Sequence, residues 1–128
     1  DIALGLDPEA TIRVRMGRGK LPASTNFRVL RRGVRRALVE ATPVTGRQHQ
    51  IRVHASLSGH PLVGDKLYGP DEALFIAAKE RVLTPSEFER LGHHRHALHA
   101  SQIRLHLGEE EIHFTSPLPD DLATLLNA

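Results

Sequence analysis

The sequence predicts a single α+β domain. Ser24–Leu30 and Ala37–Ala41 show the side-chain alternation and the strand-forming residues of a β-hairpin. Thr45–Gln48 and Thr84–Glu87 each begin with a helix-capping pattern. At 128 residues, 40% of them hydrophobic and 25% charged, the chain can bury one modest core and has the composition of an ordinary globular domain. The local patterns predict both strands and helices but not the order of the strands in a sheet.

The first twenty residues carry little recognisable chemistry. Thr11–Val14 predicts a short strand, and Met16–Lys20 has the glycines and basic residues of a mobile loop. This loop is not a phosphate-binding P-loop, because Leu21 rather than Ser or Thr follows the lysine. A basic loop that contacts RNA and an ordinary surface loop both fit the pattern.

The predicted hairpin carries four arginines at its tip: Arg31, Arg32, Arg35 and Arg36. Like charges crowded at a turn repel one another unless an anion lies nearby, so a contact with RNA phosphates is one hypothesis and a solvated basic surface is the other. Up to Lys66 the chain has twelve Lys or Arg against five Asp or Glu, a balance of +7, and the remainder has five against ten, a balance of −5. This asymmetry favours an anionic partner for the first half.

The most definite helix signal follows the hairpin. A helix of about 13 residues is expected to begin just after Thr45 and to end at Gly59 and Pro61. It would present Arg52, whose planar fork of N–H donors suits a carboxylate or a phosphate. A basic amphipathic helix with solvated arginines remains the alternative from these residues alone.

The remaining elements are shorter. Asp71–Leu83 has helical composition, a second helix should run from Thr84 to Leu91, and Ala97–Leu107 pairs with Glu111–Thr115 around a turn at Gly108-Glu109. A terminal helix is expected from Asp120 as the N-cap residue. The histidines at 93, 94 and 96 lack a cysteine or a neighbouring carboxylate to complete a ligand set, so we expect no metal site.

Composition excludes several classes of protein. The absence of cysteine removes disulfides, thiolate catalysis and cysteine-based zinc sites, and it agrees with a reducing, cytoplasmic compartment. The sequence contains neither an apolar run long enough to cross a bilayer nor a signal-peptide pattern, so no membrane partner is expected.

Four segments together resemble a known family. The longest reads TGRQHQIRVHASLSGHPLVGDKLYG, from Thr45 to Gly69. It closely resembles the signature of the RluA-type pseudouridine synthases, TGRTHQIRVHL followed by GHPIVGDxLYG, with Gln48 as the evident variation. RHALHA at 95–100, FTSPLPDDL at 114–122 and ASTNFRVL at 23–30 are similar to three further motifs of that family. The resemblance extends from about residue 20 to the C-terminus.

The resemblance implies a fold and an activity. The fold would be a mixed, mainly antiparallel sheet with packed helices, and residues 1–128 would be the C-terminal half of a pseudouridine synthase catalytic domain. Such enzymes isomerise uridine in ribosomal or transfer RNA without a cofactor, using an aspartate in the motif R-L-D-x-x-T/S-S-G. This sequence contains no such motif. We therefore expect the isolated chain to be inactive, and a noncatalytic RNA-binding module that keeps the synthase scaffold is the alternative.

The resemblance also implies roles for individual residues. Arg52 matches the arginine that pairs with the catalytic aspartate, and Leu98 matches the leucine that lines the uracil pocket. Arg47 and His49 match supporting or RNA-facing positions. The expected partner is a structured RNA stem-loop. A partial domain should also expose a sheet edge and apolar surface, which would favour self-association.

Overall fold

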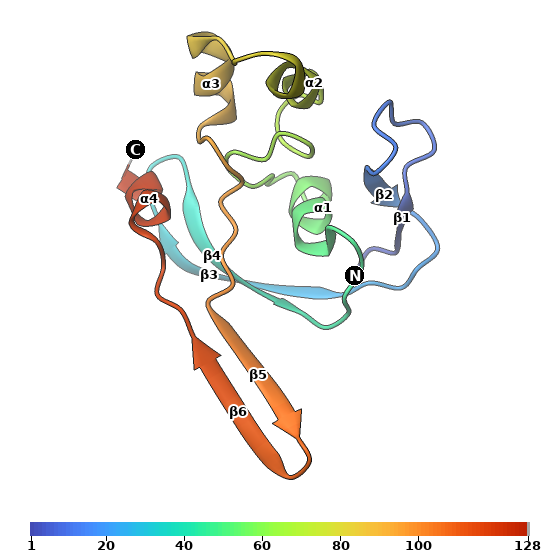
Figure 1. The fold of residues 1–128 in the computed structure, drawn as a ribbon, viewed down its shortest axis with the longest axis vertical. Helices are drawn as coiled ribbons and strands as arrows, with labels where there is room; N and C mark the ends of the chain where they lie inside the picture. Colours follow the sequence, from blue (N-terminus) through green and yellow to red (C-terminus); the bar gives the residue numbers. More distant parts are fainter. Residues whose placement is uncertain (128) are drawn as a thin grey trace. The chain divides into compact units, whose positions relative to one another are not determined.

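The computed structural model describes residues 1–127, and its residues form two compact units. The first unit comprises Asp1–Arg28 and Val39–Ala97, and the second comprises Val29–Leu38 and the residues from Leu98 onward. Helices and strands occur in both units (Figure 1), which confirms the α+β class. Within these described residues the strands pair in three two-stranded sheets. No helix in the described part of the chain has both the length and the apolar composition needed to cross a membrane.

The first unit begins with a small antiparallel pair. Strand β1 (Leu4–Leu6) pairs with β2 (Met16–Arg18), with Leu4 opposite Arg18 and Leu6 opposite Met16. The strand predicted at Thr11–Val14 is wrong, because that segment forms turns and the strand lies where we expected a mobile loop. Long-range burial explains the difference: Leu4 and Met16 enter the core, and a Cβ at Gly19 would lie 2.4 Å from the amide nitrogen of Gly5.

The helices of the first unit are α1 (Gln50–Leu57), α2 (Ala73–Glu80) and α3 (Pro85–Leu91). Helix α3 has the predicted cap at Thr84, which takes the form of a capping box: Glu87 N donates to Thr84 Oγ1, and Thr84 N donates to the Glu87 carboxylate. Gly59, just after α1, has the predicted left-handed conformation, with φ of 81°. The start of α3 and the end of α1 are thus both determined by residues close in sequence.

The predicted start of α1 is wrong. The helix begins at Gln50, not just after Thr45, and is eight residues long. The Thr45 hydroxyl accepts from Ser24 N at 3.0 Å and donates to Gln50 Oε1 at 2.6 Å, so it does not cap the helix. Gln50 Nε2 donates to Ser24 O at 2.8 Å. Contacts with the segment before β3 therefore replace the predicted capping box.

The core of the first unit lies around Tyr68. Its buried residues come from both chain segments of the unit: Leu4, Met16, Ala23, Val53, Leu67 and Tyr68. Val53 is 1% exposed and Leu4 is fully buried. Because Val53 anchors α1 to this core, the neighbouring Arg52 is held at a defined position on the helix.

The hairpin of β3 (Thr25–Arg32) and β4 (Ala37–Pro43) is confirmed, and its tip belongs to the second unit. That unit also contains the antiparallel pair β5 (Gln102–Leu107) and β6 (Glu110–Thr115), helix α4 (Asp120–Ala123) and a 3-10 turn at Thr124–Asn127. The turn at Gly108-Glu109 is as predicted. Strand β5 begins five residues later than expected, and the N-cap of α4 is Pro119 with Asp120 as the first helical residue.

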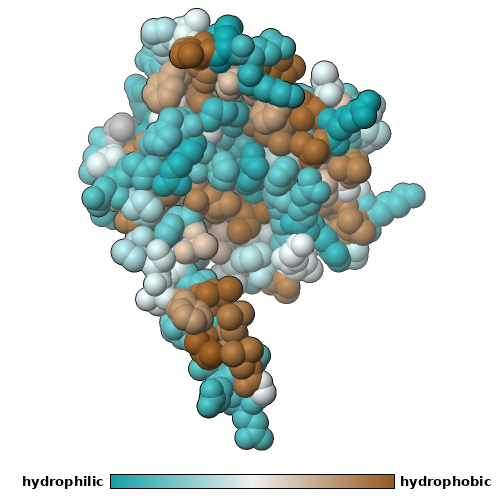
Figure 2. All heavy atoms as spheres, viewed as in Figure 1, coloured by the Kyte–Doolittle hydropathy of each residue, from teal (hydrophilic) through white to brown (hydrophobic). Residues whose placement is uncertain are grey.

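The β5–β6 hairpin has one apolar face. The register places Ile103 opposite Phe114 and Leu105 opposite Ile112. Since side chains alternate between the faces of a strand, these four share one face with Leu107. Ile103, Leu105, Leu107 and Phe114 are 42–62% exposed, and Figure 2 shows apolar residues gathered on this hairpin.

Candidate functional site

The candidate site is centred on an ion pair between Arg52 of α1 and Asp65. Arg52 Nε donates to Asp65 Oδ2 at 2.8 Å, and Arg52 Nη2 donates to Asp65 Oδ1 at 2.8 Å. The Asp65 side chain is fully buried and the Arg52 side chain is 16% exposed. Such a two-point pair fixes the plane of the guanidinium as well as its position.

A tight turn between two glycines holds Asp65. Its Oδ1 also accepts from Leu67 N at 3.1 Å and from Tyr68 N at 3.0 Å. Gly64 has φ of 76°, and a Cβ at Gly69 would lie 2.0 Å from Asp65 O. The glycines therefore let the backbone fold closely around the carboxylate.

The hydrogen bonds keep this buried carboxylate ionised. Burial acts to raise the pKa of Asp65, but the hydrogen bonds from Arg52 and the backbone amides outweigh it, and the pKa lies below its ordinary value. The hydrogen bond to Asp65 in turn raises the pKa of Arg52. Arg52 and Asp65 are therefore both charged at neutral pH.

Tyr68 lies beside Arg52 and connects it to His49. The Arg52 guanidinium carbon lies 5.1 Å from the centre of the Tyr68 ring, and Arg15 lies 5.5 Å from the same centre. The Tyr68 hydroxyl accepts from Met16 N at 2.9 Å and lies 2.8 Å from His49 Nδ1. Tyr68 thus serves the core and the candidate site together.

Two histidines, the half-buried His49 and the exposed His96, complete the surroundings of Arg52. For each, burial is the largest cause lowering the pKa, and the charge of Arg52 lowers the pKa further. Both imidazoles are therefore neutral at physiological pH. They add hydrogen-bonding groups to the site without adding charge.

Arg52 has donors to spare. Its guanidinium carries five N–H groups, and Nε and one N–H of Nη2 are used by Asp65. Within residues 1–127, neither Nη1 nor the second N–H of Nη2 has a hydrogen-bond acceptor. The site can therefore bind an oxyanion, such as a carboxylate or a phosphate, from outside this part of the chain.

The other predicted site residues have varied surroundings. Arg47 Nε donates to Pro22 O at 3.0 Å, which ties the loop before α1 to the segment before β3. Leu98 is half-buried and belongs to the second unit. At the hairpin tip, Arg31, Arg32 and Arg35 are exposed, whereas Arg36 Nη1 donates to Leu125 O at 3.2 Å.

Sequence reasoning missed Asp65 and Tyr68 as members of the site. The signal was present, since both residues lie in the GDKLYG part of the motif that also contains Arg52. Only the fold shows that the two parts of the motif contact one another.

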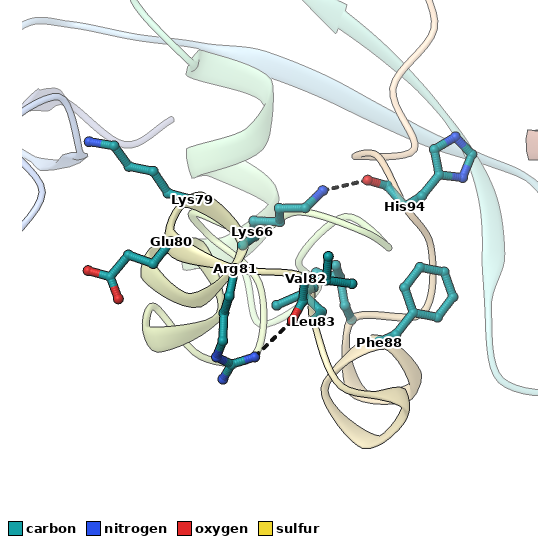
Figure 3. Close-up of a pocket in the computed structure, with 10 residues that line it drawn as sticks. Lys66, Lys79, Glu80, Arg81, Val82, Leu83, Phe88 and His94 are labelled. Atoms are coloured by element: carbon teal, nitrogen blue, oxygen red, sulfur yellow. Dashed lines mark hydrogen bonds between the residues drawn. The ribbon is translucent and has the colours of Figure 1, made fainter.

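An open pocket also lies elsewhere in the first unit. It has a volume of about 570 Å³ and lies between α2 and α3, with Lys66, Lys79, Arg81, Val82 and Phe88 among its lining residues (Figure 3). Two of its cations already have partners, because Lys66 Nζ donates to His94 O and Arg81 pairs with Glu87 at 2.7 Å. Neither Arg52 nor Asp65 lines this pocket, so it is separate from the candidate site.

Comparison with known proteins agrees with the motif. Residues 5–57 match the protein family described as RNA pseudouridylate synthase. The chain is 38% identical to ribosomal large subunit pseudouridine synthase D of Nitrosomonas europaea, over 100% of this chain and 35% of that protein. It is 36% identical to ribosomal large subunit pseudouridine synthase C of Haemophilus ducreyi, over 82% of this chain and 30% of that protein.

A solved structure gives the same result. The human protein RNA pseudouridylate synthase domain containing 4 matches 97% of this chain with a TM-score of 0.61 and 30% identity, over 49% of its own chain. Fold and motif thus agree with part of a pseudouridine synthase domain. The chain matches members of the RluA-type pseudouridine synthase family, and it spans about a third of the length of the curated relatives it matches.

Proposed function

We propose that this chain supplies the arginine-bearing part of a pseudouridine synthase active site, which isomerises uridine in ribosomal or transfer RNA. The observation that carries the proposal is the Arg52 guanidinium, which Asp65 fixes at 2.8 Å on two atoms while its other donors stay unpaired within residues 1–127. A nucleophilic carboxylate needs a fixed cation beside it to stay ionised. Arg52 is oriented to fill that role.

The nucleophile itself comes from outside these 128 residues. Asp65 is unsuited to attack a base, because it is fully buried and both of its oxygens accept hydrogen bonds. Asp7 pairs with Arg15 at 3.0 Å and Asp71 pairs with Arg90 at 3.1 Å. The missing R-L-D motif would lie in the two thirds of the relatives' length that this chain does not match.

The remaining roles follow the motif. Leu98 lines the uracil pocket, Arg47 and His49 support the RNA, and the arginines of the hairpin tip contact its phosphates. A flipped base needs an apolar wall to pack against, which suits a leucine. A ribosomal or transfer RNA substrate would place the protein in the cytoplasm.

A chimera tests the proposal. This chain replaces the matching segment of the Nitrosomonas europaea relative, and uridine conversion is measured in a ribosomal RNA stem-loop. We expect conversion by the chimera, a loss of at least a hundredfold with Arg52→Lys, whose single ammonium cannot reproduce the fork, and no conversion by the isolated chain. Arg90→Lys is the control, because Arg90 is half exposed and pairs with Asp71.

Two outcomes would overturn the proposal. Conversion by the isolated 128-residue chain would show that it contains its own nucleophile. A chimera that binds the stem-loop without converting it would favour the noncatalytic RNA-binding module.

A further inference from the structure

His49 has an unusual backbone conformation at the start of α1. Its φ is 53° and its ψ is 19°. Among residues 1–127, every other residue with a positive φ is a glycine. Side chains with a Cβ rarely adopt this left-handed conformation, and it persists where surrounding contacts hold it. Two contacts hold His49: its Nδ1 lies 2.8 Å from the Tyr68 hydroxyl, and its backbone O accepts from Val53 N at 2.9 Å.

The direction of that hydrogen bond follows from the burial of Tyr68. The phenol oxygen accepts from Met16 N at 2.9 Å, and Tyr68 is only 2% exposed. If His49 Nδ1 carried a proton and donated it, the buried Tyr68 O–H would have no acceptor among the described residues. Leaving a buried donor unpaired is costly, so the Tyr68 O–H donates to an unprotonated Nδ1.

The charges around His49 favour the same neutral form. Arg52 on α1 and His96 both act to lower its pKa, Asp65 acts to raise it, and burial has the largest effect in lowering it. Burial also raises the pKa of Tyr68, so its hydroxyl keeps its proton. A neutral imidazole whose Nδ1 is an acceptor must carry its proton on Nε2.

The Nε2–H group is available for a ligand. His49 is half-buried, its ring centre lies 5.6 Å from that of Tyr68, and within residues 1–127 Nε2 has no acceptor. A buried Nε2 without a partner would count among the buried unpaired polar atoms of this part of the chain, and it does not. Nε2 is therefore accessible to solvent. The neighbouring Arg52 has unpaired donors as well.

We propose that Tyr68 is a positioning residue that fixes His49 as a neutral donor, whose Nε2–H binds an oxygen acceptor of the RNA, either a phosphate oxygen or a base carbonyl. The identity of this ligand rests on the proposed function, but the protonation of His49 does not. The site would thus offer RNA a neutral donor beside the charged fork of Arg52.

The first test needs no RNA. Long-range ¹H–¹⁵N spectra of the 128-residue chain with ¹⁵N-labelled histidine report which ring nitrogen carries the proton, and His49→Asn assigns the signals. Asn tolerates a left-handed backbone. At neutral pH we expect His49 Nδ1 to be unprotonated and Nε2 to be protonated. A protonated Nδ1 in the unmodified chain would overturn the proposal whether or not any variant folds.

Tyr68→Phe separates positioning from packing. The variant keeps the ring beside Arg52 but removes the hydroxyl, so the stabilisation of unprotonated Nδ1 is lost and the pKa of His49 should rise. The exposed His113 on β6 serves as the internal control, and its signals should be the same in the variant and the unmodified chain. An unchanged His49 pKa and tautomer in a folded Tyr68→Phe chain would remove Tyr68 from this role.

The second test uses a ribosomal RNA stem-loop. We expect binding to shift the His49 Nε2–H signal, and we expect His49→Asn to raise Kd roughly threefold to tenfold, the range for one hydrogen bond. An abasic target nucleotide that abolishes the shift identifies a base carbonyl, whereas a methylphosphonate that does so identifies a phosphate.

Bound RNA with no shift at Nε2 would overturn the assigned ligand. Absence of any RNA binding at low salt would instead count against the proposed function, because the spectrum without RNA decides the tautomer separately.

Discussion

Asp65 and Arg52, thirteen residues apart in sequence, form a two-point ion pair whose carboxylate is fully buried. Removing one partner of such a pair leaves an uncompensated charge in the interior. Asp65→Asn keeps an acceptor for the turn amides but places an amide N–H₂ against the Arg52 donors. We expect it to lower the free energy of unfolding by about 3–5 kcal/mol, measured by urea denaturation.

Asp71→Asn is the matched control. Asp71 pairs with Arg90 at 3.1 Å, but the two side chains are 39% and 52% exposed. Because solvent screens a pair of this kind, it contributes little to stability. If the two substitutions lowered the free energy of unfolding equally, the buried Arg52–Asp65 pair would be no more important for stability than the exposed pair.

The ionisation of Asp65 predicts that the folded chain loses stability at acid pH. The pKa of Asp65 is lower in the folded state than its ordinary value of 3.8, so folding favours the ionised form. Its contribution to stability is fully present above that value and is lost as the pH falls through the lower pKa of the folded state. Unfolding free energies measured between pH 5 and pH 2, about the range over which carboxylates titrate, should fall more steeply for the unmodified chain than for Asp65→Asn. Parallel curves would contradict this.

Gly64 offers a backbone test of the same turn. A Cβ at this position would lie 2.0 Å from Arg95 O, and φ is 76°. Gly64→Ala should therefore destabilise the chain by more than 1 kcal/mol, the scale of strain in a left-handed residue alone. Gly46→Ala is the control, since nothing lies within 4 Å of its Cβ position and its φ is not positive. Thermal unfolding of the two variants gives the comparison, and a neutral Gly64→Ala would show that the turn can open without cost.

These tests concern features that sequence reasoning reached only in part. The Thr84 capping box and the Gly108 turn were predictable because their partners are local. The motif identified Arg52 as a site residue. Its pairing with Asp65 was not predicted, because it depends on how α1 packs against the turn that follows it. Local rules favoured a capping box at Thr45, and the long-range hydrogen bonds of Thr45 and Gln50 with Ser24 replaced it. Where tertiary contacts compete with local propensity, the fold decides.

The apolar face of the β5–β6 hairpin predicts self-association. Its exposed residues Ile103, Leu105, Leu107 and Phe114 lie on a two-stranded sheet, which is marginally stable alone. We expect the isolated chain to sediment as oligomers at micromolar concentration, and Leu105→Lys to shift it towards monomer. His106→Lys is the control, because its side chain lies on the opposite, polar face. A monomer at every concentration would contradict the expectation.

The arginines at the tip of the β3–β4 hairpin are expected to contribute to RNA binding through charge. Arg31, Arg32 and Arg35 are exposed, whereas Arg36 also holds Leu125 O at 3.2 Å. Changing the first three to Gln and keeping Arg36 therefore removes charge without releasing the C-terminal turn. We expect weaker binding to a ribosomal RNA stem-loop and a shallower dependence of log Kd on log salt, because each lost phosphate contact lowers the slope by roughly 0.7–0.9.

The salt slope distinguishes contact from general charge. A control variant with Arg81→Gln and Arg90→Gln removes two cations that pair with Glu87 and Asp71, so its slope should change little. Adding Arg36→Gln to the triple variant tests the fourth arginine, with urea unfolding run in parallel to detect loss of the Leu125 contact. If the triple variant and the control had the same slope, the four arginines would be a solvated surface and the RNA contact would have to be sought around Arg52.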